Sequence, residues 1–165
     1  MTEYHIIGNN ALFGELNLQG SKNASLPILA ATLLTSSRSV IHNCPDLTDV
    51  TAALKILEHI GCRIKREGHT VIVDSTDANR FDIPDKLMRE MRSSIVFLGA
   101  LLARFGAACV SSPGGCEIGL RPIDLHLSAL RKMNTYINET GGFLECATDN
   151  LCGADINLAF PSVGA

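Results

Sequence analysis

The feature that most constrains the fold of this chain is an order of predicted elements that occurs twice. The first unit reads helix, strand, helix, strand, strand, over residues 26–34, 39–42, 46–61, 62–65 and 70–74. The same order recurs over residues 95–103, 108–111, 123–133, 135–137 and 142–146. The first helix of each unit is apolar all round, which is typical of a buried helix. The repetition predicts an α/β (α+β) fold made of two similar units.

The two units differ in length at one place. Leu33 matches Leu101 at an offset of 68 residues, whereas Leu54 matches Leu130 at an offset of 76. The second unit therefore has about eight more residues between its first strand and its second helix, in the glycine-rich segment 112–121. Glycines let a backbone approach a ligand closely, so we interpret this insertion as a functional loop. A neutral surface insertion is the alternative.

Size and charge exclude several classes of protein. A chain of 165 residues, 46% of them hydrophobic, can bury a core and form one domain or a piece of a larger one. The formal net charge of −3 argues against a general nucleic-acid binder, which needs a basic face. The longest apolar stretches reach half the length of a membrane-spanning helix, and Met1–His5 does not resemble a signal peptide. We therefore expect a cytoplasmic protein without a membrane or nucleic-acid partner.

The cysteines suggest packing at five positions and chemistry at one. A reducing compartment argues against disulfides, and the spacing of the six cysteines fits no zinc site. Cys116 stands out because glycines flank it and Arg121 follows it. A thiol near cationic groups and backbone N–H donors has a lowered pKa and becomes reactive. An inert thiol is the alternative. The other five, expected in the core, are Cys44, Cys62, Cys109, Cys146 and Cys152.

Four segments of the chain resemble one family of enzymes. Residues Pro113–Leu127 closely resemble the active loop of UDP-N-acetylglucosamine 1-carboxyvinyltransferases, which are enolpyruvyl transferases. Gly20–Pro27 is similar to the Lys-Asn segment of that family, and Met91–Ile95 to its Met-Arg-Ala-Ser segment. Pro161–Ala165 matches a further family segment. The resemblance implies the inverse α/β barrel-like domain of the enolpyruvyl transferase fold.

The resemblance also implies a reaction. The enolpyruvyl group of phosphoenolpyruvate is transferred to the 3-hydroxyl of UDP-N-acetylglucosamine with release of phosphate, which is the first committed step of peptidoglycan synthesis. The sugar hydroxyl adds to C2 of phosphoenolpyruvate while C3 takes a proton, and the tetrahedral ketal then expels phosphate. The scheme requires no metal or cofactor. Its two substrates, both anionic, are the expected partners.

Three residues are implied at the phosphoenolpyruvate. Cys116 would be the reactive thiol, which in this family donates a proton, forms a covalent adduct with the substrate and is alkylated by fosfomycin. Lys22 would lie beside the phosphate and carboxylate, where a compact ammonium suits a small dianion. Asn23 would hold a hydroxyl or reacting group. The alternatives are a solvated lysine for Lys22 and a helix N-cap for Asn23.

A larger set is implied at the nucleotide sugar. Arg92 would add positive charge to the substrate site; alternatively, it is a surface residue that pairs with Glu90 or Glu117. Arg121 could bridge diphosphate oxygens. Asp124 could accept a hydrogen bond from uracil or sugar, or else cap a helix. His126 is expected to be structural. The full set for UDP-N-acetylglucosamine is Arg92, Arg121, Pro122, Ile123, Asp124, Leu125, Ser162, Val163 and Gly164.

Family members are about two and a half times as long as this chain. We therefore expect residues 1–21 to form a strand pair that belongs to another domain, and 22–165 to form a partial domain with units at about 22–75 and 91–147. Such an N-terminal portion is expected to be inactive alone and to self-associate through uncovered apolar faces. Two alternatives stay open: a non-catalytic nucleotide-sugar-binding or interaction module, and a shikimate-pathway enolpyruvyl transferase.

Overall fold

The computed structural model describes residues 3–9, 11–91, 93–111 and 123–162. The helices are α1 (Lys22–Ala31), α2 (Thr48–Ile60), α3 (Asp85–Glu90), α4 (Val96–Phe105) and α5 (Asp124–Lys132), and a 3₁₀ turn, η1 (Thr32–Thr35), follows α1. The strands are β1 (Arg38–Ile41), β2 (Arg63–Glu67), β3 (Thr70–Asp74), β4 (Asp82–Ile83), β5 (Ala107–Ser111), β6 (Tyr136–Thr140) and β7 (Phe143–Ala147). No described helix is long and apolar enough to cross a bilayer.

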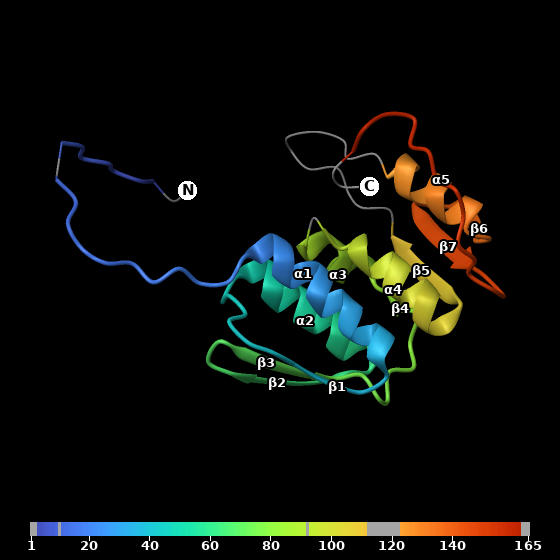
Figure 1. Ribbon diagram of the computed structural model, residues 1–165, viewed down its shortest axis with the longest axis horizontal. Coiled ribbons are helices and arrows are strands. Elements are labelled where there is room, and N and C mark those ends of the chain that lie inside the picture. The colour runs from blue at the N-terminus through green and yellow to red at the C-terminus, as the bar shows by residue number, and fades with distance from the viewer. Residues whose placement is uncertain (1–2, 10, 92, 112–122, 163–165) are drawn as a thin grey trace.

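The strands form two sheets that share one arrangement (Figure 1). The first sheet has the order β1-β3-β2, and the second repeats it as β5-β7-β6 with β4 added at the edge of β5. Each unit ends in a hairpin whose two-residue turn lies between closing pairs, Glu67 with Thr70 and Thr140 with Phe143. The turns contain Gly68 and Gly141 at φ 57° and 61°, the left-handed region that tight hairpins need.

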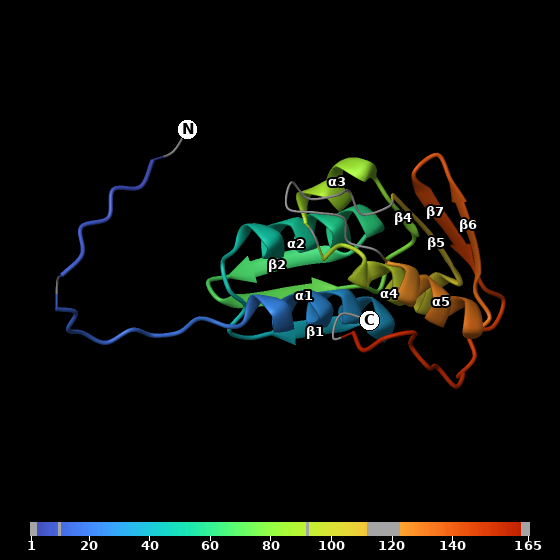
Figure 2. The ribbon, with the colours of Figure 1, turned by 90° about the horizontal axis from the view of Figure 1, so that it is seen from above.

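The helices cover the inner faces of the sheets and share one hydrophobic core. Figures 1 and 2 show α1 and α2 side by side over the first sheet, with α4 next to α1. Alternate residues of the central strands point into this core: Val71 and Val73 of β3 are buried, as are Leu144 and Cys146 of β7. The opposite faces of these strands are more exposed, which is the period of two that a half-buried strand requires.

Helix α1 is buried on one side, whereas its apolar sequence predicted burial all round. Leu26 and Leu29 are buried against the core. Ile28, however, is 49% exposed, and Leu34 in η1 is 54% exposed. Helices α2 and α4 pack on the inner side of α1, and no described element covers the outer side.

The polar segment 76–86, which contains one proline, predicts a loop, and the structure differs from this prediction from residue 82 onward. Residues 82–83 form β4, which pairs in parallel with β5 through Asp82 with Cys109 and Ile83 with Val110. Helix α3 follows directly and buries Met88. A parallel pair gains its hydrogen bonds from a strand that is distant in sequence, so local patterning gave no signal for it.

The expected N-terminal strand pair does not form. Residues 3–9 and 11–21 contain no helix or strand, and the segment extends away from the core in Figure 1. Its large apolar side chains, Leu12 and Phe13 among them, are exposed. An isolated strand pair is marginal in water without a further strand or helix to bury its apolar face. The assignment of these residues to another domain stays a prediction.

Candidate functional site

Two of the predicted phosphoenolpyruvate residues, Lys22 and Asn23, begin the first turn of α1. Both side chains are on the exposed side of the helix. Ser21 occupies the N-cap position with extended backbone, so the alternative role of Asn23 as N-cap was wrong. The Ser21 side chain makes no capping bond to a described residue, and the first-turn N–H groups of a helix favour an anionic ligand.

Lys22 forms an ion pair with Asp49, the second residue of α2. The Lys22 Nζ lies 3.0 Å from Asp49 Oδ2, with the side chains 48% and 26% exposed. The pairing is possible because β1 returns antiparallel to α1, so both helices begin at the same end of the molecule (Figure 2). A cation at a helix N-terminus opposes the helix dipole, and the carboxylate offsets this. Lys22 is therefore paired rather than simply solvated.

Sequence reasoning missed Asp49 as the partner of Lys22. The stretch from Asp46 to Asp49 contains several residues that favour a helix N-cap, and its sequence indicates no other role for Asp49. The structure places Leu47 at the N-cap and Asp49 inside the first turn, where a negative charge is favourable. The pairing could not be read from spacing, because 26 residues, including strand β1, lie between Lys22 and Asp49 in the chain.

The turn that precedes Lys22 packs tightly against the loop between β1 and α2. A Cβ on Gly20 would overlap the carbonyl oxygen of Asn43, so only glycine fits there without movement. The Gln19 Oε1 accepts a hydrogen bond from the Asp46 N–H at 3.4 Å. Ser25 donates through its hydroxyl to the Ser21 carbonyl at 2.8 Å. These contacts set the direction in which the chain enters α1.

The Met91–Ile95 segment is anchored on both sides of Arg92. Met91 is buried, and the fully buried Ser94 donates its hydroxyl proton to the Met88 carbonyl at 3.0 Å. Glu90, named as an alternative partner of Arg92, accepts from Lys55 Nζ at 2.9 Å. Arg92 itself lies outside the described residues.

A cavity of about 490 Å³ lies between the start of α2 and the end of α3. Its charged groups are of both signs, and it adjoins the Lys22–Asp49 pair through Thr48. Glu90, two residues before Arg92, closes its other side. The lining residues are Asp46, Leu47, Thr48, Thr51, Ala52, Lys55 and Glu90.

The predicted nucleotide-sugar residues that are described lie elsewhere. Ile123 is the N-cap of α5, Asp124 is its first residue and exposed, and Leu125 is half-buried. Asp124 is therefore not the helix cap. Figures 1 and 2 both place α5 at the opposite end of the molecule from the first turn of α1. Ser162 is half-buried in a segment without helix or strand. The remaining predicted residues, Cys116, Arg121, Pro122, Val163 and Gly164, lie outside the described residues.

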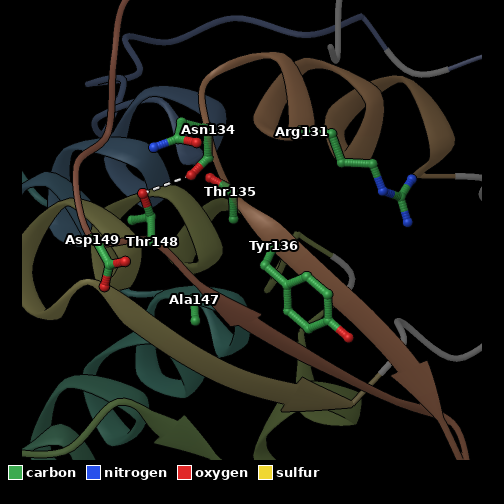
Figure 3. A pocket seen from close by; sticks show the side chains of 7 residues that line it. All are labelled: Arg131, Asn134, Thr135, Tyr136, Ala147, Thr148 and Asp149. Carbon is green, nitrogen blue, oxygen red and sulfur yellow. Dashed lines mark hydrogen bonds between the residues drawn. The ribbon is translucent and has the colours of Figure 1, made fainter.

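A second cavity, of about 390 Å³, holds none of the predicted site residues (Figure 3). It lies where α5 leads into β6 and where β7 ends, and the Thr148 hydroxyl donates to the Asn134 carbonyl at 2.8 Å across it. Its lining residues are Arg131, Asn134, Thr135, Tyr136, Ala147, Thr148 and Asp149.

The five described cysteines are free thiols. Burial raises the pKa of Cys62 and of Cys146 to about 11, and it also raises the pKa of Cys44 and of Cys109. These four thiols are poor nucleophiles near neutral pH, as expected for packing residues. Cys152 is exposed, so its assignment to the core was wrong.

Sequence comparison relates the chain to carboxyvinyltransferases. The model of the EPSP synthase (3-phosphoshikimate 1-carboxyvinyltransferase) family matches residues 6–165. The UDP-N-acetylglucosamine 1-carboxyvinyltransferase 2 of Caldanaerobacter subterraneus subsp. tengcongensis is 50% identical over 165 residues, covering 100% of this chain and 40% of that protein. The UDP-N-acetylglucosamine 1-carboxyvinyltransferase 1 of Carboxydothermus hydrogenoformans is 44% identical, covering 100% and 39%. The chain thus spans about two fifths of the length of these relatives.

Solved structures confirm the predicted fold class. The enolpyruvyl transferase NikO from Streptomyces tendae matches with a TM-score of 0.77 at 24% identity, covering 88% of this chain and 32% of that chain. The EPSP synthase from Acinetobacter baumannii matches with a TM-score of 0.68 at 18% identity, covering 95% and 37%. Both share the α/β arrangement of helices and sheets described above, of which this chain represents a part.

Proposed function

This chain belongs to the EPSP synthase (3-phosphoshikimate 1-carboxyvinyltransferase) family, and from that premise we propose that it carries the Lys22 side of an enolpyruvyl transferase site. The proposed reaction transfers the enolpyruvyl group of phosphoenolpyruvate to the 3-hydroxyl of UDP-N-acetylglucosamine. The names of relatives that are 44–50% identical over the whole chain support this acceptor. Both substrates are cytoplasmic metabolites, and we place the activity in the cytoplasm.

The observation that carries the proposal is the Lys22–Asp49 pair at the start of α1. The pair is partly exposed, with 3.0 Å between Nζ and Oδ2, and such pairs contribute about 0–1 kcal/mol. An incoming dianion can therefore compete for the Lys22 ammonium at little cost. The N–H groups of the first turn of α1 lie beside it and favour the same negative charge.

The proposed reaction needs more positive charge than Lys22 supplies, and it also needs a proton donor. As charge moves onto the phosphate leaving group, cations close to it lower the barrier. In the proposal Lys22 binds the phosphate and carboxylate, Arg92 and Arg121 add positive charge, and Cys116 delivers a proton. The amide of Asn23 orients the reacting groups. The segment from Pro122 to Leu125, with Ser162, Val163 and Gly164, is proposed to hold the nucleotide sugar.

One observation favours a second acceptor. The matching family model is described as 3-phosphoshikimate 1-carboxyvinyltransferase, and enolpyruvyl transferases of different substrate share this fold. The cysteine at position 116 and the names of the relatives favour the nucleotide sugar over 3-phosphoshikimate.

Labelling of Cys116 by fosfomycin tests the proposal. We expect an adduct on the peptide that contains Cys116, formed at least ten times faster with UDP-N-acetylglucosamine than without it. The exposed Cys152 serves as an internal control, and Cys116→Ser removes the adduct. Promotion by 3-phosphoshikimate instead would favour the second acceptor. Labelling of Cys152 and Cys116 alike, or of neither, would favour a binding module without this chemistry.

The exposed apolar side of α1 supports our expectation that the chain alone self-associates. Ile28 and Leu34 lie there without cover from the described residues. Sedimentation over a range of chain concentrations measures this, and a monomer at all concentrations would contradict it.

A further inference from the structure

Arg66 occupies an unusual place for a cation. It lies on β2 among the side chains that face the helices, and its side chain is 24% exposed. A charged group that is largely removed from water must be compensated by hydrogen bonds or an opposite charge. One of these partners is in its own hairpin, where the Arg66 Nε donates to the Gly68 carbonyl at 3.1 Å.

The other donors of Arg66 hold the loop between β1 and α2. The Nη2 donates to the Pro45 carbonyl at 3.1 Å and to the Cys44 carbonyl at 3.4 Å. The Nη1 lies 3.5 Å from Asp46 Oδ1. One planar fork therefore binds three consecutive residues of a loop, which a lysine could not reproduce.

This loop bends sharply beside the contacts of Arg66. Asn43 has φ 53°, a left-handed conformation in which asparagine is enriched among residues other than glycine. The next residue, Cys44, donates its N–H to the His69 carbonyl at 2.7 Å, which ties the loop to the hairpin turn. The loop is therefore hydrogen-bonded to the hairpin at two places, through the Arg66 side chain and through the His69 carbonyl.

The loop in turn contacts the segment that carries Lys22. The Asn43 carbonyl occupies the space that a side chain on Gly20 would need. Gln19, in the same segment as Gly20, accepts a hydrogen bond through its Oε1 from the Asp46 N–H at 3.4 Å. After Leu47 the loop becomes α2, where Asp49 binds Lys22. The position of Asp49 relative to Lys22 therefore depends on the loop that Arg66 holds.

The second unit shows that the hairpin itself does not require an arginine here. Arg66 pairs with Val71 across the first hairpin, and the residue in the same register of the second hairpin is Glu139, opposite Leu144. Glu139 instead accepts a hydrogen bond from Arg131 of α5 at 3.1 Å, and the second hairpin forms without an arginine at this position. The arginine belongs to the unit that carries Lys22.

We propose that Arg66 is a positioning residue for the Lys22–Asp49 pair. It acts through the 43–46 loop, which it anchors to the hairpin, and not by touching a ligand. The consequence for phosphoenolpyruvate affinity rests on the proposed function, whereas the positioning of Lys22 does not.

The test follows the Lys22 side chain by NMR in the whole chain after ¹³C reductive methylation of the lysines. The resonance that disappears in Lys22→Arg is that of Lys22. Asp49→Asn then shows the chemical shift of Lys22 when the ion pair is lost. We expect Arg66→Met to move the Lys22 resonance most of the way to the Asp49→Asn position. Arg63→Met is the matched control, because Arg63 lies on the same strand and pairs with Asp74 and Asp77 outside the loop.

An unchanged Lys22 resonance in folded Arg66→Met, or an equal change in Arg63→Met, would overturn the proposal. If Arg66→Met does not fold, Arg66→Lys replaces it, and an intermediate shift is expected because one carbonyl contact survives. Phosphoenolpyruvate is then titrated into each chain, and we expect about five- to tenfold weaker binding to Arg66→Met than to the wild type or Arg63→Met. If phosphoenolpyruvate does not change the Lys22 resonance of the wild type, the proposed function is contradicted. The comparison of Arg66→Met with Arg63→Met without ligand still tests the positioning role of Arg66.

Discussion

The backbone of Gly20 lies so close to the carbonyl oxygen of Asn43 that a Cβ at position 20 would overlap it. We expect Gly20→Ala to lower the free energy of unfolding by about 1–3 kcal/mol, because the rigid backbone of the loop must shift. Gly99→Ala is the control, since Gly99 lies within α4 and a Cβ there meets nothing within 4 Å. It should stabilise the chain by about 0.5–1 kcal/mol. Urea denaturation measures both, and equal effects would contradict the assigned packing.

The Lys22–Asp49 pair should contribute a salt-dependent part of stability. Asp49→Asn removes both the ion pair and a favourable charge in the first turn of α2, so we expect a loss of about 0.5–1 kcal/mol at low salt. In 1 M NaCl the loss should shrink, because the screening length falls to about 3 Å. Glu67→Gln is the control, because it breaks the exposed Lys65–Glu67 pair on strand β2, where no helix dipole contributes. A loss independent of salt would show that packing, and not charge, is responsible.

The buried thiols should differ sharply from the exposed one in reactivity. The pKa of Cys62 and of Cys146 is about 11, so at pH 8 about one thiol in a thousand is ionised at these positions. Iodoacetamide should therefore modify Cys152 in the folded chain and leave Cys62 and Cys146 unmodified until denaturant is added. Peptide mass mapping over time measures the three rates. Equal rates in the folded chain would contradict the burial of the two thiols.

Stability should fall at acid pH through Asp82. The Arg80 guanidinium, with His59 and its hydrogen bond, holds the pKa of the Asp82 carboxyl below its ordinary value near 3.8. A carboxyl with a lowered folded-state pKa stabilises the fold above the unfolded-state value, and this is lost as pH falls through the folded-state value. Asp82→Asn should therefore flatten the acid side of the stability curve. Urea unfolding between pH 2.5 and 6 measures this, and superimposable curves would contradict it.

Local patterns predicted most elements correctly. The repeated order of elements placed strand pairs at 62–65 with 70–74 and at 135–137 with 142–146, and the structure forms hairpins at both places. The same patterns failed where an element depends on a distant partner. Strand β4 exists because β5 lies beside it, and the N-terminal segment lacks the partner that its alternation would need.

The sequence by itself determined the order of the elements, their repetition and the resemblance that marks Lys22, Asn23 and Cys116. These follow from neighbours along the chain, whose periodicity and turn residues act locally. The tertiary structure decided that Lys22 pairs with Asp49, and that Arg66 faces the helices and binds the loop beside them. Such contacts depend on how β1 returns the chain between two helices, and no spacing in the sequence records that path.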